Sequence, residues 1–145
     1  MTSPRRQILL VEDDDSHAEL ISRCFAMAPL PTTIHRCSDG EQAVQLLIAA
    51  ESQGQEPMRN FALIILDQRL PKINGLDVLK KLHARGVTRA VPVVIFSTST
   101  SASDRELALK FGARDYISKP VGYDEFSATI QKMTEYLTET NRQTA

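Results

Sequence analysis

Several features that mark special classes of protein are scarce in this sequence. It contains no tryptophan and two cysteines, Cys24 and Cys37, whose spacing does not fit a C-x-x-C metal or redox pair. We predict that both are small buried apolar residues. No apolar run approaches the ~20 residues that cross a bilayer, and the opening MTSPRRQ has no apolar secretory signal. These absences predict a cytoplasmic protein without a membrane partner.

An excess of charge of either sign is also missing. The formal net charge is −1, so the chain as a whole has no electrostatic tendency to bind nucleic acid. With 145 residues, 42% of them hydrophobic and 24% charged, it has the composition of one globular domain. We predict a single domain over residues 1–145, with its core at about 7–137, a polar loop at Glu51–Asn60 and a polar tail at 139–145.

Five short runs with strand character predict five strands. They are Ile8–Val11, Thr32–His35, Ala62–Leu66, Val91–Phe96 and Asp115–Ile117. Three of them are apolar at successive positions rather than at alternate ones, which is typical of strands buried on both faces of a parallel sheet.

Segments with helical periodicity separate these runs, and each carries an apolar stripe. The stripes are Ala18, Ile21, Cys24, Phe25 and Ala28; Ala43, Leu46, Leu47 and Ala50; Leu76, Leu79 and Leu82; Leu107 and Phe111; and Phe126, Ile130, Met133 and Leu137. The pairs Asp14-Asp15, Asp39-Gly40, Asn74-Gly75 and Ser103-Asp104 are start signals for the first four helices. The alternation predicts an α/β fold, a strand–helix unit repeated five times with right-handed crossovers.

Chemically active side chains follow the strands at their carboxyl ends. Glu12, Asp13 and Asp14 follow the first run, Asp67 the third, Ser97 and Thr98 the fourth, and Lys119-Pro120 the fifth. In an open parallel sheet, these ends form the ligand-binding crevice. In the strand order 2-1-3-4-5, which is common for such sheets, the first and third strands are neighbours, so Asp13 and Asp67 would face each other.

This set of side chains suits the transfer of a phosphoryl group. Gathered carboxylates repel each other unless a cation joins them, and Mg²⁺ takes one or two carboxylates together with water and a phosphate oxygen. Asp13 and Asp67 suit direct ligation, and Glu12 is long enough to reach a metal-bound water. Lys119 and Ser97 offer the positive charge and the donor that phosphoryl oxygens need. A carboxylate that attacks phosphorus forms an acyl phosphate.

Each feature also has a plainer interpretation when it is taken alone. The acidic run from Glu12 to Asp15 would suit the solvated start of a helix. Asp67 would serve as a turn or capping residue, Ser97 and Thr98 as caps, and Lys119 as a surface lysine. Four groups of side chains with different chemistry follow four strands on one side of one sheet. This combination favours the phosphoryl site.

Four stretches of this chain resemble the receiver domains of two-component response regulators. They are ILLVEDD (8–14), LIILDQRLPKINGLDVL (63–79), VPVVIFSTS (91–99) and FGARDYISKPV (111–121). The resemblance covers about Gln7 to Leu137 and implies a doubly wound, flavodoxin-like sandwich with the order 2-1-3-4-5.

The resemblance implies a role for each matching site residue. Asp67 would be the phosphoacceptor, and Lys119 would pair with the phosphoryl oxygens, next to a cis Lys119–Pro120 bond. Asp13, with Glu12 beside it, would hold Mg²⁺ together with Asp67 and the backbone carbonyl of Arg69. Arg69 and Ser99 stand at variable positions of the family and would tune dephosphorylation. Thr98, bulkier than the alanine often found there, would narrow access to the acceptor.

A phosphorylation switch is also implied. Ser97 would move toward the phosphoryl group, and Tyr116 would turn inward. The responding surface would be the helix after Ser103-Asp104, the strand Asp115–Ile117 and the helix that carries Phe126. It would bind a downstream target or a second copy in a homodimer.

The phosphoryl donor implied by the resemblance is the phosphohistidine of a sensor histidine kinase. The long Glu51–Asn60 loop and the S-T-S run at 97–99 are similar to the regulators that partner bacterial phytochromes. A bacteriophytochrome is therefore the expected kinase.

Three other functions remain open. A phosphatase with an aspartyl-phosphate intermediate usually has a second aspartate two residues after the nucleophile, where this chain has Arg69. A flavin-binding domain of this topology has a Ser/Thr-rich phosphate loop after its first strand, which is missing here. A receiver that only docks partners has no need of the intact set Asp13, Asp67, Ser97 and Lys119. The preferred function is thus a signalling protein rather than an enzyme, one that catalyses its own phosphorylation and dephosphorylation.

Overall fold

The computed structural model describes residues 6–54 and 58–138. Its strands form one parallel sheet in the order β2-β1-β3-β4-β5. They are β1 (Arg6–Val11), β2 (Thr32–Cys37), β3 (Leu63–Leu66), β4 (Val93–Ser97) and β5 (Asp115–Ser118). The α/β class and the strand order predicted from the sequence are confirmed.

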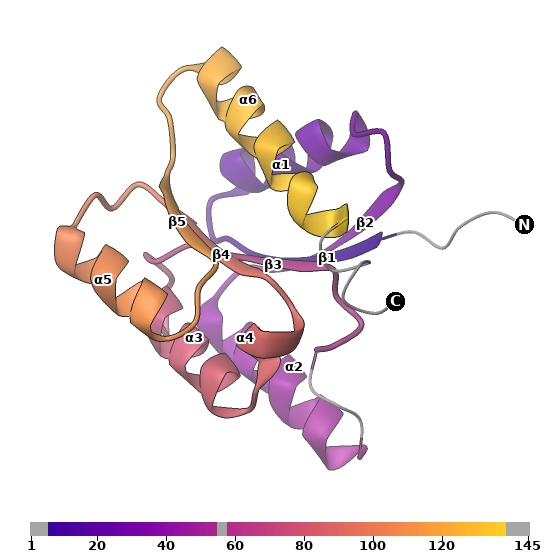
Figure 1. Cartoon of the computed structure of the whole chain (residues 1–145), viewed down its shortest axis with the longest axis vertical. Coiled ribbons are helices and arrows are strands. Elements are labelled where there is room, and N and C mark those ends of the chain that lie inside the picture. The colour runs from indigo at the N-terminus through magenta and orange to yellow at the C-terminus, as the bar shows by residue number, and fades with distance from the viewer. Residues whose placement is uncertain (1–5, 55–57, 139–145) are drawn as a thin grey trace, which may run out of the picture.

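Helices cover both faces of this sheet (Figure 1). One face carries α1 (Asp15–Ala26) and α6 (Tyr123–Met133), and the other carries α2 (Gly40–Ser52), α3 (Gly75–Ala84), α4 (Val87–Ala90) and α5 (Ala102–Lys110). Side chains alternate along β1, so Ile8 and Leu10 join the core under α1 and α6, while Leu9 and Val11 join the other core. The uninterrupted apolar run at 8–11 therefore reflects a strand buried on both faces.

The first three helices begin where the sequence predicts. The side chains of Asp14, Asp39 and Asn74 accept hydrogen bonds from backbone amides in the first turns of α1, α2 and α3. Helix α5 begins at Ala102, before the predicted Ser103-Asp104, because Ser101 is its N-cap and accepts from the Asp104 amide at 3.3 Å.

Most predicted core residues are buried, with exceptions on α2 and α5. The stripes on α1, α3 and α6 are confirmed, apart from Ala28, which lies beyond the end of α1 and is half-buried. Leu46 on α2 and Leu107 on α5 are 42% and 37% exposed, so their prediction as core residues is wrong. On α5 the fully buried residue is Ala108, which brings the helix close to the sheet with little side-chain bulk.

The predicted polar loop at Glu51–Asn60 also needs correction. Helix α2 continues through Glu51 to Ser52, and the Glu51 carboxylate accepts a hydrogen bond from Arg85 at 2.9 Å. Met58 is 3% exposed and belongs to the core. Residues 55–57 of this loop and the predicted tail at 139–145 lie outside the described residues.

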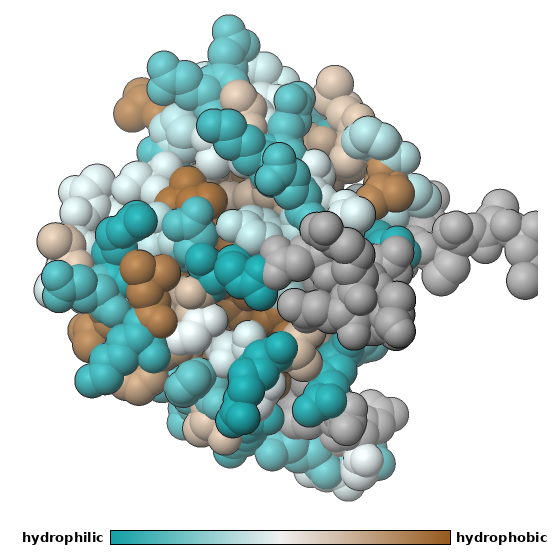
Figure 2. Space-filling view, in the orientation of Figure 1, coloured by the Kyte–Doolittle hydropathy of each residue, from teal (hydrophilic) through white to brown (hydrophobic). Residues whose placement is uncertain are grey.

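The surface carries few large apolar patches on the side shown in Figure 2, where hydrophobic residues lie as separate spots among hydrophilic ones. Both cysteines are buried, as predicted. Among the described residues, no helix is long and apolar enough to cross a membrane.

Candidate functional site

The carboxyl ends of four strands bring the predicted side chains together. Glu12 and Asp13 follow β1, Asp67 follows β3, Ser97 ends β4 and Lys119 follows β5. Glu12, Asp13 and Asp67 each offer one carboxylate oxygen within 4.8 Å of the others. The parallel register places β1 between β2 and β3, so the neighbouring strand ends predicted for Asp13 and Asp67 are observed.

Asp67 is held at both carboxylate oxygens. Its Oδ1 accepts from the Ser97 hydroxyl at 2.7 Å and from the Arg69 amide at 3.0 Å, and its Oδ2 accepts from Lys119 Nζ at 2.9 Å. Burial raises the pKa of Asp67, but the charge and hydrogen bond of Lys119, with the bonds from Ser97 and Arg69, outweigh it and lower the pKa below its usual value. The carboxylate is therefore ionised, oriented and only 6% exposed.

Lys119 joins the two buried acids of the site. Its Nζ donates to Glu12 Oε1 at 2.5 Å as well as to Asp67, and its side chain is 2% exposed. Burial raises the pKa of Glu12 to about 7, aided by the nearby charge of Asp67 and opposed by Lys119. Since removal of one partner from a buried ion pair leaves an uncompensated charge, the three side chains depend on one another.

The carboxylates fit a hard divalent cation. Asp13 is exposed, while Glu12 and Asp67 are buried, so the three oxygens form a cluster that is open to solvent on one side. Oxygen donors with room for water are what Mg²⁺ requires, because it keeps part of its hydration shell. The donor set contains neither nitrogen nor sulfur and does not suit a soft metal.

The start of α3 packs against the backbone of Asp67. A Cβ on Gly75 would lie 2.2 Å from the Asp67 carbonyl oxygen, so only glycine fits there. The Gly75 amide donates to the Gln68 carbonyl at 3.0 Å, and the Gln68 side chain accepts from the Leu76 amide at 2.8 Å. These bonds fix the segment that carries the acceptor carboxylate.

Tyr116 and Ser99 connect the site to α5. Tyr116 is 4% exposed, and its hydroxyl donates to the Ser99 carbonyl at 3.0 Å. The Ser99 amide donates to Ser97 Oγ at 3.3 Å, and its hydroxyl donates to Asp104 at 3.1 Å. Thr98, between Ser97 and Ser99 in the sequence, is exposed. In this structure Ser97 already contacts the acceptor and Tyr116 already lies inward.

The predicted cis bond is wrong. Every peptide bond in the described part of the chain is trans, including Lys119–Pro120. An X–Pro bond prefers trans by ~0.5–1 kcal/mol, so a proline alone does not dictate the cis form. The Lys119 amide donates to the Ser97 carbonyl at 2.8 Å, which ties the β5 end to the β4 end with this trans geometry.

Two residues near the site were not predicted. His17, on the first turn of α1, places Nδ1 2.9 Å from Lys119 Nζ and packs its ring against Phe126. Arg36, on β2, donates from Nε and a terminal nitrogen to the Glu12 carbonyl. Neither belongs to a recognisable motif. The only signal for Arg36 was a cation near the end of the strand beside β1.

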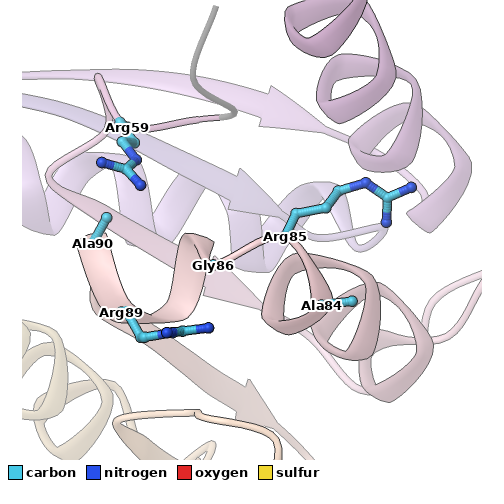
Figure 3. Close-up of a pocket in the computed structure, with 6 residues that line it drawn as sticks. All are labelled: Arg59, Ala84, Arg85, Gly86, Arg89 and Ala90. Carbon is cyan, nitrogen blue, oxygen red and sulfur yellow. The ribbon is translucent and has the colours of Figure 1, made fainter.

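The hollow in Figure 3 lies elsewhere. It has a volume of about 520 Å³ and is lined by Arg59, Ala84, Arg85, Gly86, Arg89 and Ala90. Arg59 precedes β3 and Ala90 precedes β4, so the hollow lies at the amino-terminal edge of the sheet, opposite the acidic cluster. Arg85 turns away from it toward Glu51. Its lining contains no carboxylate or hydroxyl that would accept a phosphoryl group.

A comparison with protein families now identifies the chain. A model described as the response regulator receiver domain matches residues 8–131. The chain belongs to this family.

Individual relatives of this receiver domain differ in length. The probable methanogenesis regulatory protein FilR2 of Methanothrix harundinacea is 36% identical, over 93% of this chain and 85% of its own length. The transcriptional regulatory protein CpxR of Escherichia coli is 34% identical over 86% of this chain, which spans 47% of CpxR. The chain thus covers most of one relative and about half of the other.

Solved structures confirm the flavodoxin-like receiver fold. The phosphorylated cyanobacterial phytochrome response regulator RcpA has a TM-score of 0.81 and 26% identity, over 94% of this chain and 96% of its own. A receiver domain from Rhodospirillum rubrum has a TM-score of 0.77 and 30% identity, over 91% and 93%.

Proposed function

We propose that this receiver domain accepts a phosphoryl group on Asp67 from the phosphohistidine of a sensor histidine kinase, in a reaction that requires Mg²⁺. The observation that carries the proposal is the setting of Asp67: an ionised carboxylate bound by Lys119 and Ser97, beside two further acids. General family membership supports a kinase partner and a downstream target.

The chemistry follows from these contacts. A carboxylate oxygen of Asp67 attacks phosphorus, the bond from phosphorus to the imidazole nitrogen breaks, and that nitrogen keeps the electron pair. The product is an acyl phosphate on Asp67. Lys119 and Ser97 would pair with the phosphoryl oxygens. Their contacts with Asp67 support this role.

Mg²⁺ would be held by Asp13 and Asp67, with Glu12 beside them and the Arg69 backbone carbonyl as a further ligand. When bound, it would neutralise charge on the phosphoryl oxygens. The role of the Arg69 carbonyl stays a prediction. The Arg69 amide already donates to Asp67, which places this residue next to the acceptor.

Output would pass through the surface formed by α5, β5 and α6. A phosphoryl group that binds the Ser97 hydroxyl would alter the hydrogen bond that this hydroxyl accepts from the Ser99 amide. The change would reach Tyr116, whose hydroxyl donates to the Ser99 carbonyl. Arg105 on α5 donates to the Tyr116 carbonyl at 2.9 Å, so this bond joins α5 to β5. This surface would bind a target protein or a second copy, with Ser99 and Arg69 tuning dephosphorylation.

We further propose a bacteriophytochrome as the kinase and the cytoplasm as the location. The similarity to RcpA, itself a phytochrome response regulator, supports the first. The second is the compartment expected from the sequence. Transfer from an autophosphorylated phytochrome kinase, measured against an unrelated histidine kinase, tests the pairing; equal rates from both would contradict it.

The experiment for the central proposal is intact mass after incubation with acetyl phosphate, with Mg²⁺ or with EDTA. Wild type should gain one phosphoryl group only with Mg²⁺, and hydroxylamine should remove it, as expected for an acyl phosphate. Asp67→Asn should gain none. Asp77→Asn, which changes an exposed aspartate on α3, is the matched control and should behave like wild type.

The contrary outcomes are distinct. A gain that survives Asp67→Asn would place the acceptor on another residue. If neither acetyl phosphate nor a cognate kinase labels wild type, the chain is a receiver that only docks partners. Light scattering with and without phosphorylation tests the homodimer, and the mass of a monomer in both states would exclude it.

A further inference from the structure

We propose that Arg36 is a positioning residue for the Mg²⁺ site, although it is not a ligand: it clamps the backbone of the loop that carries Asp13. This inference rests on the proposed function, because it concerns the same metal. It assigns a role to an edge strand, β2, that contributes no side chain to the acidic cluster.

The contacts of Arg36 converge on one loop. Its Nε and one terminal nitrogen donate to the Glu12 carbonyl at 3.0 and 2.9 Å. The other terminal nitrogen lies 2.8 Å from Asp15 Oδ1. The planar guanidinium thus spans the acidic run from its first residue to its last, which the single ammonium of a lysine does not match.

The end of β2 holds Glu12 on both sides of its backbone. Leu10 and Val11 pair with Arg36 and Cys37 in the sheet, and the Glu12 amide continues this ladder by donating to the Cys37 carbonyl at 2.9 Å. Because the Arg36 fork holds the Glu12 carbonyl, the peptide plane between Glu12 and Asp13 cannot rotate freely.

Asp13 depends on that peptide plane for its position. Within the described part of the chain, its carboxylate takes part in no hydrogen bond or ion pair, whereas Glu12 and Asp67 are fixed by Lys119. The backbone therefore sets the direction of the Asp13 Cα–Cβ bond, from which the carboxylate reaches the acidic cluster. A backbone held from outside lets Asp13 remain open to the metal and still point at Asp67.

The Asp15 contact contributes less than the carbonyl contacts. The Asp15 side chain is 93% exposed, and solvent screens such a pair strongly. The Arg36 side chain is 31% exposed, and its bonds to the Glu12 carbonyl join a charged donor to a part-buried acceptor. We therefore attribute the clamp to the carbonyl bonds.

An effect of the Arg36 charge and an effect of its position would change the Mg²⁺ affinity in opposite directions, so the direction of the change distinguishes them. A cation near a metal site repels Mg²⁺, so an effect of charge alone would make Arg36→Met bind Mg²⁺ more tightly and leave Arg36→Lys unchanged. A positioning effect would weaken binding in both variants, because neither keeps the fork. Loss of an outer partner of a metal site typically weakens metal binding by about 10- to 100-fold.

The experiment is calorimetric titration of the full chain with Mg²⁺ for wild type, Arg36→Met, Arg36→Lys and Arg23→Met. Arg23 is the matched control, an exposed arginine on α1 whose 2.7 Å ion pair with Glu19 lies away from the loop. We expect about tenfold weaker binding in both Arg36 variants and no change in Arg23→Met. Thermal unfolding without Mg²⁺ checks the fold, and Arg36→Lys carries the test if Arg36→Met does not fold.

Two results would overturn the inference in different ways. Affinity within twofold of wild type in both Arg36 variants, or tighter binding in Arg36→Met, would remove the positioning role and leave the proposed function intact. Absence of Mg²⁺ binding by wild type would overturn the proposed function and the role of Arg36 with it.

Discussion

At the residue scale, the closest backbone approach in the site gives a sharp prediction. Gly75→Ala would place a methyl group against the Asp67 carbonyl oxygen at 2.2 Å and the Gln68 Cα at 2.8 Å, both of them backbone atoms that cannot rotate away. We expect the free energy of unfolding to fall by about 2–3 kcal/mol, as for an overpacked core. Labelling of Asp67 by acetyl phosphate should fall too, because the acceptor segment must move.

The control for this change is Gly122→Ala. Nothing lies within 4 Å of a Cβ at Gly122, and its φ of −81° suits alanine. Gly122 is the N-cap of α6, so a loss below about 1 kcal/mol is expected there. Urea unfolding measures both variants. Equal losses would show that α3 does not press on the acceptor segment.

The buried thiols give a prediction about pH. Burial, aided by the charge of Asp39, raises the pKa of Cys37 to about 11. At pH 8 roughly one thiol in a thousand is then a thiolate, which is the reactive form. We expect iodoacetamide to leave Cys37 unmodified in the folded protein at pH 8 and to modify it faster as the pH rises toward 11. In denaturant both cysteines should react, and fast native labelling at pH 8 would contradict the burial.

The sequence predicted some site residues and missed others for a physical reason. Asp67, Ser97 and Lys119 were predictable because each directly follows or ends a predicted strand, and the carboxyl ends of parallel strands lie on the same side of a sheet. Arg36 and His17 reach the site by side-chain length and direction from β2 and α1. Such reach depends on rotamers, which the pattern of residue types does not contain.

At the element scale, core residues were predicted correctly on a helix with a clear apolar face, α3, and incorrectly on a helix without one, α5. Leu79 and Leu82 on α3 are at most 1% exposed, as their spacing predicts. Helix α5 has polar residues around most of its circumference and buries Ala108 rather than Leu107. A weak apolar stripe does not determine which side of a helix faces the sheet. In α5 that side is determined by the close packing of a small residue.

The different burial of Leu79 and Leu107 predicts that replacing each leucine with alanine lowers the free energy of unfolding by different amounts. Leu79→Ala should lower the free energy of unfolding by about 2–5 kcal/mol, because it opens a cavity in a closed core. Leu107→Ala, at a position 37% exposed, should cost less than about 1 kcal/mol. Chemical unfolding followed by circular dichroism measures both. A larger loss for Leu107→Ala than for Leu79→Ala would mean that α5 is rotated in solution.

At the scale of the whole molecule, the sheet separates two cores and carries the site on one edge. The loops after β1, β3 and β5 supply the acids and the lysine, and the last residue of β4 supplies the hydroxyl, so the geometry of the site depends on the packing of helices on both faces. The short α4 and the extension of α2 were not predicted, yet neither alters that edge. The part of the fold that positions the site was therefore predictable, while the structure at the amino-terminal ends of the strands was not.

The acidic cluster links the stability of the whole domain to Mg²⁺, and Asp13→Asn reveals the sign of that linkage. Without Mg²⁺, Asp13 lies within 4.8 Å of two other carboxylates, so a neutral asparagine should stabilise the fold by roughly 1 kcal/mol. With Mg²⁺ at 100 times its dissociation constant, wild type should gain about 2.7 kcal/mol. Asp13→Asn should gain far less, because it has lost a ligand. Thermal unfolding in EDTA and in Mg²⁺ should therefore rank the two proteins in opposite orders, whereas Asp77→Asn should respond to Mg²⁺ as wild type does. The same rank in both buffers would mean that Asp13 is not part of the metal site.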